Sequence, residues 1–158
     1  MANIVPFSFK GELLSGTHNF ANGGDSFKIA LYNGTISATY TTSSTVVSTN
    51  DEVSSGGSSN YARKALTSQA VVATTATSSV DFADVTWGAA TTGAATFGAA
   101  FGAIYNTNTV DGVANRLVVV LDFSGTKTAT AGDFTVAYPD PTTGSPAGVA
   151  AIISLNAN

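Results

Sequence analysis

Apolar and polar residues alternate with a period of two in several short stretches of this chain, which is the pattern of β-strands that bury one face. The alternation is clearest in residues 25–33 and 133–138. It also occurs in residues 79–87, where a change of phase near Ala83 and Asp84 predicts a bulge or a break. Because Asn, Gly and Ser separate these stretches, the pattern predicts short strands joined by turns.

A continuous apolar stretch at residues 116–123 differs from the alternating ones. It predicts a strand that is covered on both faces and that ends at Ser124 and Gly125. We also expect strands at residues 61–75, where the composition would accept a helix as well, and at residues 148–155.

Residues 93–106 combine aromatic side chains with many small ones. A helix is conceivable there, because Phe97 and Phe101 are four residues apart. Three glycines argue against it, since each costs about 1 kcal/mol in a helix relative to alanine. We therefore predict a strand whose glycines let a neighbouring element or a partner approach closely.

One short helix is expected at residues 6–16. A proline opens this stretch and a glycine ends it, which is the usual placement of both residues around a helix. Phe9, Leu13 and Leu14 fall at spacings of four and five, roughly on one helical face.

The Ser/Thr-rich residues 34–60 have little apolar content, so we expect a weak edge strand at residues 37–47 and then a long surface loop. Together the elements predict an all-β fold, a single antiparallel β-sandwich or barrel of jelly-roll type with one short N-terminal helix. One domain spans residues 1–158. The N-terminal segment 1–24 and the Ser/Thr-rich loop region 34–60 are candidates for arms that order on contact.

Charged residues make up only 10% of the chain, against about 25% in average proteins, and the net charge is −4 with no cysteine. A surface of Thr, Ser, Asn and Ala suits protein contact, because docking then desolvates little charge. The basic residues are scattered, so we expect no nucleic acid partner. The chain has neither a signal-peptide pattern nor an apolar run of about 18 residues, so we expect synthesis in the host cytoplasm and no membrane partner.

Residues that could perform catalysis are few. His18 is the only histidine, and no nucleophile motif accompanies it, so we interpret it as a structural or exposed residue. Asp51 and Glu52 are adjacent acidic residues in a Ser/Thr-rich stretch, where a solvated pair is the expected state. We therefore expect a protein that is not an enzyme.

Metal and sugar sites are two further possibilities. Asp81, Asp84 and Asp122 could supply oxygen ligands for calcium, but their spacing matches no calcium loop, so we expect no metal and no cofactor. Trp87 could stack on a sugar, but its place in a predicted strand favours the core.

Short motifs along most of the chain resemble those of small virion proteins of tailed bacteriophages. They are Phe7-x-Phe9-Lys10, Glu12-Leu13-Leu14, Gly16-x-His18-Asn19-Phe20, Phe27-Lys28-Ile29-Ala30-Leu31-Tyr32, Val80-x-Phe82, Trp87, Ala103-Ile104-Tyr105-Asn106, Val120-Leu121-Asp122-Phe123-Ser124-Gly125 and Gly132-Asp133-Phe134-Thr135-Val136. The resemblance implies a structural role in the particle, as a capsid decoration (cement) protein or a tail-associated protein. It implies no catalytic residues.

We therefore expect a decoration subunit in the virion, which stabilises the phage head through contacts with the major capsid protein or other virion proteins and forms a homo-oligomer such as a trimer. A tail, adaptor or fibre-associated protein and a carbohydrate- or receptor-binding module are the alternatives. Five aromatic residues are expected in the interface or in core packing, a choice that the sequence leaves open: Phe7, Phe9, Phe20, Phe97 and Phe101.

Overall fold

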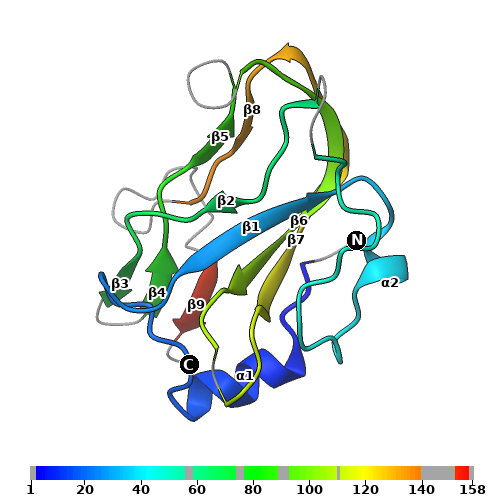
Figure 1. Ribbon diagram of the computed structural model, residues 1–158. Coiled ribbons are helices and arrows are strands. Elements are labelled where there is room, and N and C mark those ends of the chain that lie inside the picture. The colour runs from blue at the N-terminus through cyan, green and yellow to red at the C-terminus, as the bar shows by residue number, and fades with distance from the viewer. Residues whose placement is uncertain are drawn as a thin grey trace.

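The computed structural model describes residues 3–55, 59–73, 77–88, 93–109, 111–139 and 152–156, and most of the elements that they form are strands (Figure 1). In chain order these elements are α1 (Phe7–Leu14), β1 (Phe27–Tyr32), α2 (Ile36–Thr39), β2 (Lys64–Ala65), β3 (Ala70–Ala73), β4 (Thr77–Asp81), β5 (Val85–Trp87), β6 (Ala95–Asn106), β7 (Arg116–Gly132), β8 (Phe134–Val136) and β9 (Ile153–Asn156).

The described strands form three antiparallel sheets, with strand orders β2-β1-β6-β7, β3-β4-β9 and β5-β8. The predicted all-β, antiparallel class and the helix near the N-terminus are thus confirmed. None of the described sheets closes into a barrel. Neither described helix has the length that a membrane-spanning helix needs.

The four-stranded sheet is buried on both faces, and this places the core. Phe27, Ile29 and Leu31 of β1 face one hydrophobic cluster, which strands β4, β5 and β8 also line. Ala30 and Tyr32 face a second cluster on the opposite side. The period-two pattern of residues 25–33 had suggested one buried face, but only Lys28 at the start of the strand is exposed.

Ser/Thr-rich residues 34–55 cover the second face of that sheet, instead of forming the expected edge strand at residues 37–47. Ile36 and Tyr40 are buried in the second cluster, and α2 begins where the strand was predicted to begin. The predicted helix near the N-terminus is therefore not the only one. Local apolar content was a poor guide, because a few widely spaced apolar side chains suffice to cover a face that β1 and β6 already supply.

Strand β7 continues to Gly132 and does not end at Ser124 and Gly125 as predicted. Both residues have positive φ, and here the pairing with β6 skips from Phe101↔Asp122 to Ala99↔Lys127. Ser124 and Gly125 therefore lie in a large bulge within one strand of 17 residues.

Several local predictions match the structure. The break within residues 79–87 separates β4 from β5, and the expected helix at residues 6–16 is α1. The expected strand at residues 61–75 is instead two strands, β2 and β3. The last predicted strand is β9, while residues 148–151 of that prediction lie outside the described residues.

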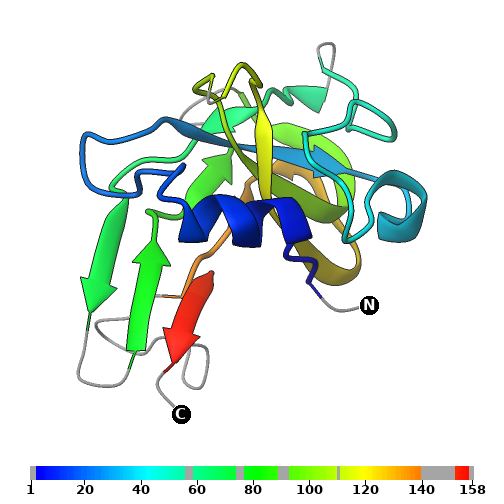
Figure 2. The same cartoon turned by 90° about the horizontal axis from the view of Figure 1, so that it is seen from below.

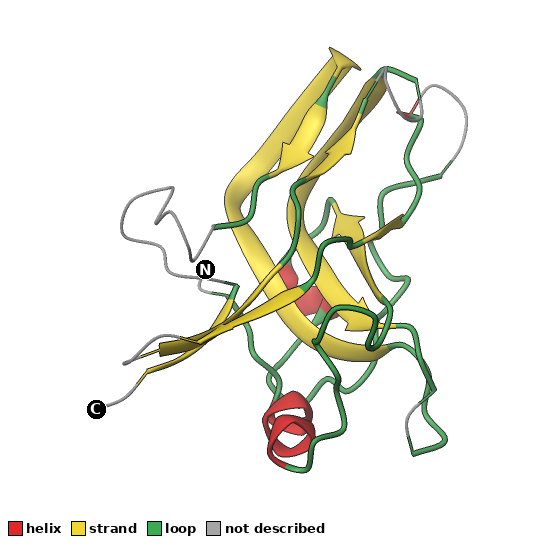
Figure 3. Ribbon diagram, turned by 90° about the vertical axis from the view of Figure 1, so that its left-hand side faces the viewer, coloured by secondary structure: helices red, strands yellow, loops and turns green. Residues whose placement is uncertain are grey.

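The three-stranded sheet β3-β4-β9 stands apart from the four-stranded sheet. Figure 2 shows its strands side by side, extending to one side of α1 and the central sheet. Figure 3 shows the same sheet from its edge, again separate from the long strands β6 and β7. Its inner end reaches the core through Val80, which is buried, and Ile153, which packs against the same cluster.

Candidate protein-contact surfaces

The five predicted phenylalanines separate into one surface residue and four core residues. Phe7 is 65% exposed. The other four are buried within the chain, so their role is core packing and not contact with a partner: Phe9, Phe20, Phe97 and Phe101.

Helix α1 carries an apolar stripe on its outer face. Phe7 and Leu14 are seven residues apart, which places them on the same side of the helix, and Leu14 is 91% exposed. Lys10 lies between them, with its Nζ atom 5.2 Å from the centre of the Phe7 ring. Leu14 does not share a buried face with Phe9, which is the only fully buried residue of α1. The outer stripe is thus free to contact another molecule.

A polar network holds the loop after α1 against the end of β6. The His18 ring lies between two partners: Nε2 is 2.8 Å from Glu12 Oε2, and Nδ1 is 3.0 Å from Asn106 Nδ2. Glu12 also pairs with Arg116 at the start of β7. The sequence left open whether His18 is structural or exposed, and its side chain is fully buried.

The orientation of the Asn106 amide determines which nitrogen of His18 carries the proton. Asn106 Nδ2 donates to Asp25 Oδ2 at 2.7 Å, and Asn106 Oδ1 accepts from the backbone N–H of Asn108 at 2.9 Å. The reverse orientation would place Oδ1 against a carboxylate. His18 Nδ1 therefore accepts from Asn106, and its Nε2–H donates to Glu12. Since both ring nitrogens are engaged in the interior, the geometry is structural and leaves no nitrogen for a substrate.

Glu52 and Asp51, predicted to be a solvated pair, have different environments. Asp51 is exposed and accepts a hydrogen bond from the Thr39 hydroxyl at 3.2 Å. Glu52 lies below the surface, where it binds Arg63 and accepts a hydrogen bond from the Tyr61 hydroxyl at 2.9 Å. The hydrogen bonds that Arg63 donates to Glu52 raise the pKa of Arg63 above its ordinary value. Glu52 is thus part of the attachment of residues 34–55 to the sheet.

The acidic residues considered for calcium do not gather. Asp84 accepts the backbone N–H of Tyr138 at 2.8 Å, whereas Asp122 accepts the N–H of Ser124, also at 2.8 Å. Within the described ranges, no three or more His, Cys, Asp or Glu residues form a group that could hold a metal ion. Trp87 is completely buried and donates its indole N–H to the Ala62 carbonyl at 2.7 Å, so it cannot stack on a sugar.

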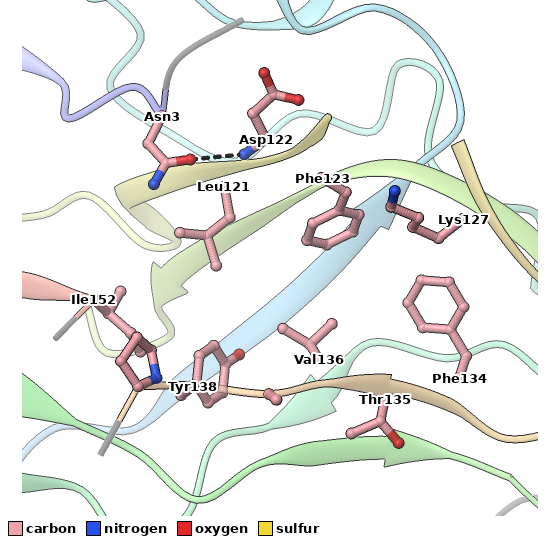
Figure 4. A pocket seen from close by; sticks show the side chains of 12 residues that line it. Asn3, Leu121, Asp122, Phe123, Lys127, Phe134, Thr135, Val136, Tyr138 and Ile152 are labelled. Atoms are coloured by element: carbon pink, nitrogen blue, oxygen red, sulfur yellow. Dashed lines mark hydrogen bonds between the residues drawn. The ribbon is translucent and has the colours of Figure 1, made fainter. Parts of the chain in front are cut away.

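A pocket of about 340 Å³ opens beside the β7 bulge (Figure 4). Leu121, Phe123 and Phe134 supply apolar walls, while Asp122 and Lys127 place opposite charges among its lining residues. The Asn3 side chain accepts the backbone N–H of Asp122 at 2.9 Å and so attaches the N-terminal segment to the pocket. No sequence pattern could identify this pocket, because its walls come from four separate parts of the chain.

A second hollow of about 310 Å³ lies between the residues that follow α1 and one face of the three-stranded sheet. Its described lining is largely apolar and carries no Asp, Glu, Lys or Arg. These residues are Leu13, His18, Asn19, Phe20, Ala21, Val71, Ser78, Ser79, Val80, Ile153 and Leu155.

Comparison of the chain with models of protein families, with curated proteins and with solved structures finds no match in any of the three.

Proposed function

We propose that this chain is a structural protein of a tailed-phage virion, a decoration subunit that binds the capsid through protein contacts and performs no catalysis. One observation carries the proposal. Two pairs of ionisable groups below the surface of the described residues, Glu12–His18 and Glu52–Arg63, hold the fold, while large apolar side chains of α1 point outward. Such a chain offers surfaces for contact where an enzyme would offer reactive groups.

The outer stripe of α1 is the proposed capsid-binding surface. Exposed Phe7 and Leu14 provide apolar area, and only Lys10 on that face has to retain its hydration. A subunit that binds only the assembled shell stabilises that state by mass action, by about 2.7 kcal/mol when its free concentration is about 100 times Kd. The protein would be made in the host cytoplasm and would act in the virion.

We also propose a sandwich-like arrangement of the domain around this role. Phe97 of β6 and Phe134 of β8 pack with ring centres 5.0 Å apart, and Trp87 of β5 meets Phe97 edge to face. The four-stranded sheet and the β5-β8 pair thus share one core, which gives α1 a rigid support.

Cryo-electron microscopy of virions from a phage that encodes this chain tests the proposal. Density for the chain at symmetry-related positions over the capsid lattice supports a decoration subunit. Density at the tail, at one vertex or in a fibre would replace it with the tail-associated alternative. Absence of the chain from purified virions would overturn both.

A double variant tests the capsid-binding surface. Phe7→Ser with Leu14→Ser removes the apolar stripe from positions that are already exposed, so the fold is retained. We expect at least a tenfold loss of binding to capsids that lack the protein, measured by co-sedimentation. Val46→Ser, at another exposed apolar position, is the matched control and is expected to bind normally. Equal binding by all three proteins would show that α1 is not the contact.

The pocket in Figure 4 favours a second candidate, a receptor- or carbohydrate-binding module. Its lining includes the aromatic residues Phe123, Phe134 and Tyr138 together with polar Asn3 and Thr135, a combination found in ligand sites.

A glycan array with the purified chain tests this candidate. Binding that Ala137→Arg abolishes would support it, since Ala137 is exposed and lines the pocket. Ala114→Arg is the control, because Ala114 is exposed but does not line the pocket. Binding that both variants retain would place the ligand elsewhere.

A further inference from the structure

We infer that the three-stranded sheet β3-β4-β9 is a self-association surface, and that its partner is a second copy of this chain. The inference adds a second contact surface to the proposed structural protein, and its biological role rests on that proposed function. The evidence for self-association is separate, however, because this surface does not include Phe7 or Leu14. It consists of Leu13, the residues that follow α1 and the three-stranded sheet beside them.

One face of this sheet is apolar well beyond the part that the core covers. Val71 and Ile153 flank Val80 in the strand register, so the three side chains share a face, and Leu155 lies two residues further along β9 on the same face. Val80 is buried, but Val71 is 55% exposed and Leu155 is 60% exposed. The exposed pair therefore extends an existing apolar cluster outward to the surface.

Both outer strands of the sheet have an edge that pairs with no other described strand. They are short, but their sequences, Ala70-Val71-Val72-Ala73 and Ile153-Ser154-Leu155-Asn156, carry no charged residue and no proline. Charged residues and prolines are devices that usually prevent edge strands from joining another sheet. Their absence from both edges keeps the surface open to contact with another chain.

The net charge of the chain and the absence of charge from the described lining of the hollow beside this sheet indicate which partner would bind there. The chain has a net charge of −4, so two copies repel each other over most of their surfaces. The hollow beside this sheet is lined by no described charged residue, and an adjoining hollow that shares Ala21 and Val71 is also uncharged. A symmetric contact places each surface against itself, so a charge there would meet its like. An uncharged apolar face is what a copy of this acidic chain can accept, whereas a basic partner would gain nothing from it.

Sedimentation of the purified full-length chain tests the inference. We expect reversible self-association at micromolar concentrations, and Val71→Lys and Leu155→Lys each to weaken it at least tenfold. Val46→Lys is the matched control at an exposed valine outside the hollow, and it is expected to associate like the parent chain. A parent chain that stays monomeric up to about a hundred micromolar, or lysine variants that associate normally, would overturn the inference.

Salt gives a second test that does not depend on a variant. Added salt screens the repulsion between two copies of net charge −4, so association through an uncharged face is expected to strengthen or stay constant. Association that weakens as salt rises would indicate a contact between opposite charges and would contradict this surface.

Cysteine variants provide a third test, since the chain contains no cysteine of its own. Under mild oxidation Val71→Cys is expected to give a disulfide-linked dimer, because this position lies on the exposed part of the face that the two copies share, and Val46→Cys is expected to remain monomeric. Cross-linking at neither position, or equally at both, would argue against the surface. The Phe7→Ser, Leu14→Ser variant should still self-associate, so failure of capsid binding and failure of self-association are separate results.

Discussion

Arg63 binds Glu52 through two nearly parallel hydrogen bonds, from Nε to Oε1 at 2.8 Å and from Nη2 to Oε2 at 2.6 Å. Arg63 also lies over the Tyr105 ring at 5.3 Å. The paired residues are 11 positions apart. They join the Ser/Thr-rich segment, which contains Glu52, to Arg63 directly before β2. Because both side chains are mostly buried, with exposed fractions of 24% and 16%, this pair is an attachment point of the fold.

Glu52→Gln is expected to lower the free energy of unfolding by about 2–3 kcal/mol, because it leaves the Arg63 charge without its counter-ion. The loss falls at the lower end for buried pairs, since water still reaches both groups. Urea unfolding followed by the fluorescence of Trp87, the only tryptophan, measures it. Asp51→Asn makes the same change of charge at the neighbouring exposed residue and is expected to cost less than about 0.5 kcal/mol. Equal losses in the two variants would contradict the assignment.

Four of the five tyrosines are expected to resist ionisation until the protein unfolds. Burial raises the pKa of Tyr32, Tyr40, Tyr61 and Tyr138 above the ordinary value of 10.0. Above that pH the unfolded chain loses phenol protons that the folded chain keeps, so stability is fully present below pH 10.0 and falls as the pH rises further. Ultraviolet absorbance of tyrosinate and circular dichroism, recorded together, are expected to change at the same pH. Smooth ionisation of all five tyrosines with the structure intact would refute this.

Two glycines are expected to respond to alanine with opposite signs. At Gly102 an added Cβ would lie 3.1 Å from Ile29 Cδ1 and 3.2 Å from Phe123 Cζ, so Gly102→Ala should destabilise the protein by about 1–3 kcal/mol. At Gly11, within α1, an added Cβ meets nothing within 4 Å, so Gly11→Ala should stabilise it by about 0.5–1 kcal/mol. Thermal unfolding of both variants measures the difference. A stabilising effect at Gly102 would show that β1 and β7 do not pack closely there.

In the neutral His18 ring the proton is expected on Nε2, because Asn106 donates to Nδ1. Nitrogen NMR of the single imidazole ring distinguishes the two tautomers directly. Asn106→Ala is expected to cost about 1–3 kcal/mol, since it leaves the buried Nδ1 atom of His18 without its donor and removes one of the two donors to Asp25 Oδ2. A proton found on Nδ1 in the native protein would mean that the Asn106 amide is reversed.

Local patterns predicted those elements whose cause is local. The break between Phe82 and Val85 followed from a phase change visible in nine residues, and α1 followed from its flanking proline and glycine. The end predicted at Ser124 was wrong because β6 continues alongside and holds β7 in its sheet through the bulge. A turn sequence such as Ser124-Gly125 does not show whether a neighbouring strand pairs with the residues on both sides of it.

The candidate surfaces were harder to predict than the strands, because exposure depends on packing between distant segments. Phe7 and Phe9 are equally apolar, yet their positions on α1 place one outside and the other against His18 and Phe20. No sequence pattern connected Asn106 with its partner His18, since the two residues are 88 positions apart. The composition predicts a protein that works through protein–protein contacts, but it does not identify the side chains that would form them.

The N-terminal segment that contains helix α1 is fastened to the long strand β7 at two places: Glu12 of α1 pairs with Arg116, and the backbone of Ile4, before the helix, forms two hydrogen bonds with Val120. A molecule that grips the outer side of this helix therefore pulls on the central strands and not on a loose end. Force applied there would act on the Glu12–Arg116 ion pair and on the two hydrogen bonds between Ile4 and Val120. The N-terminal region can thus serve as a handle that transmits mechanical force into the body of the protein.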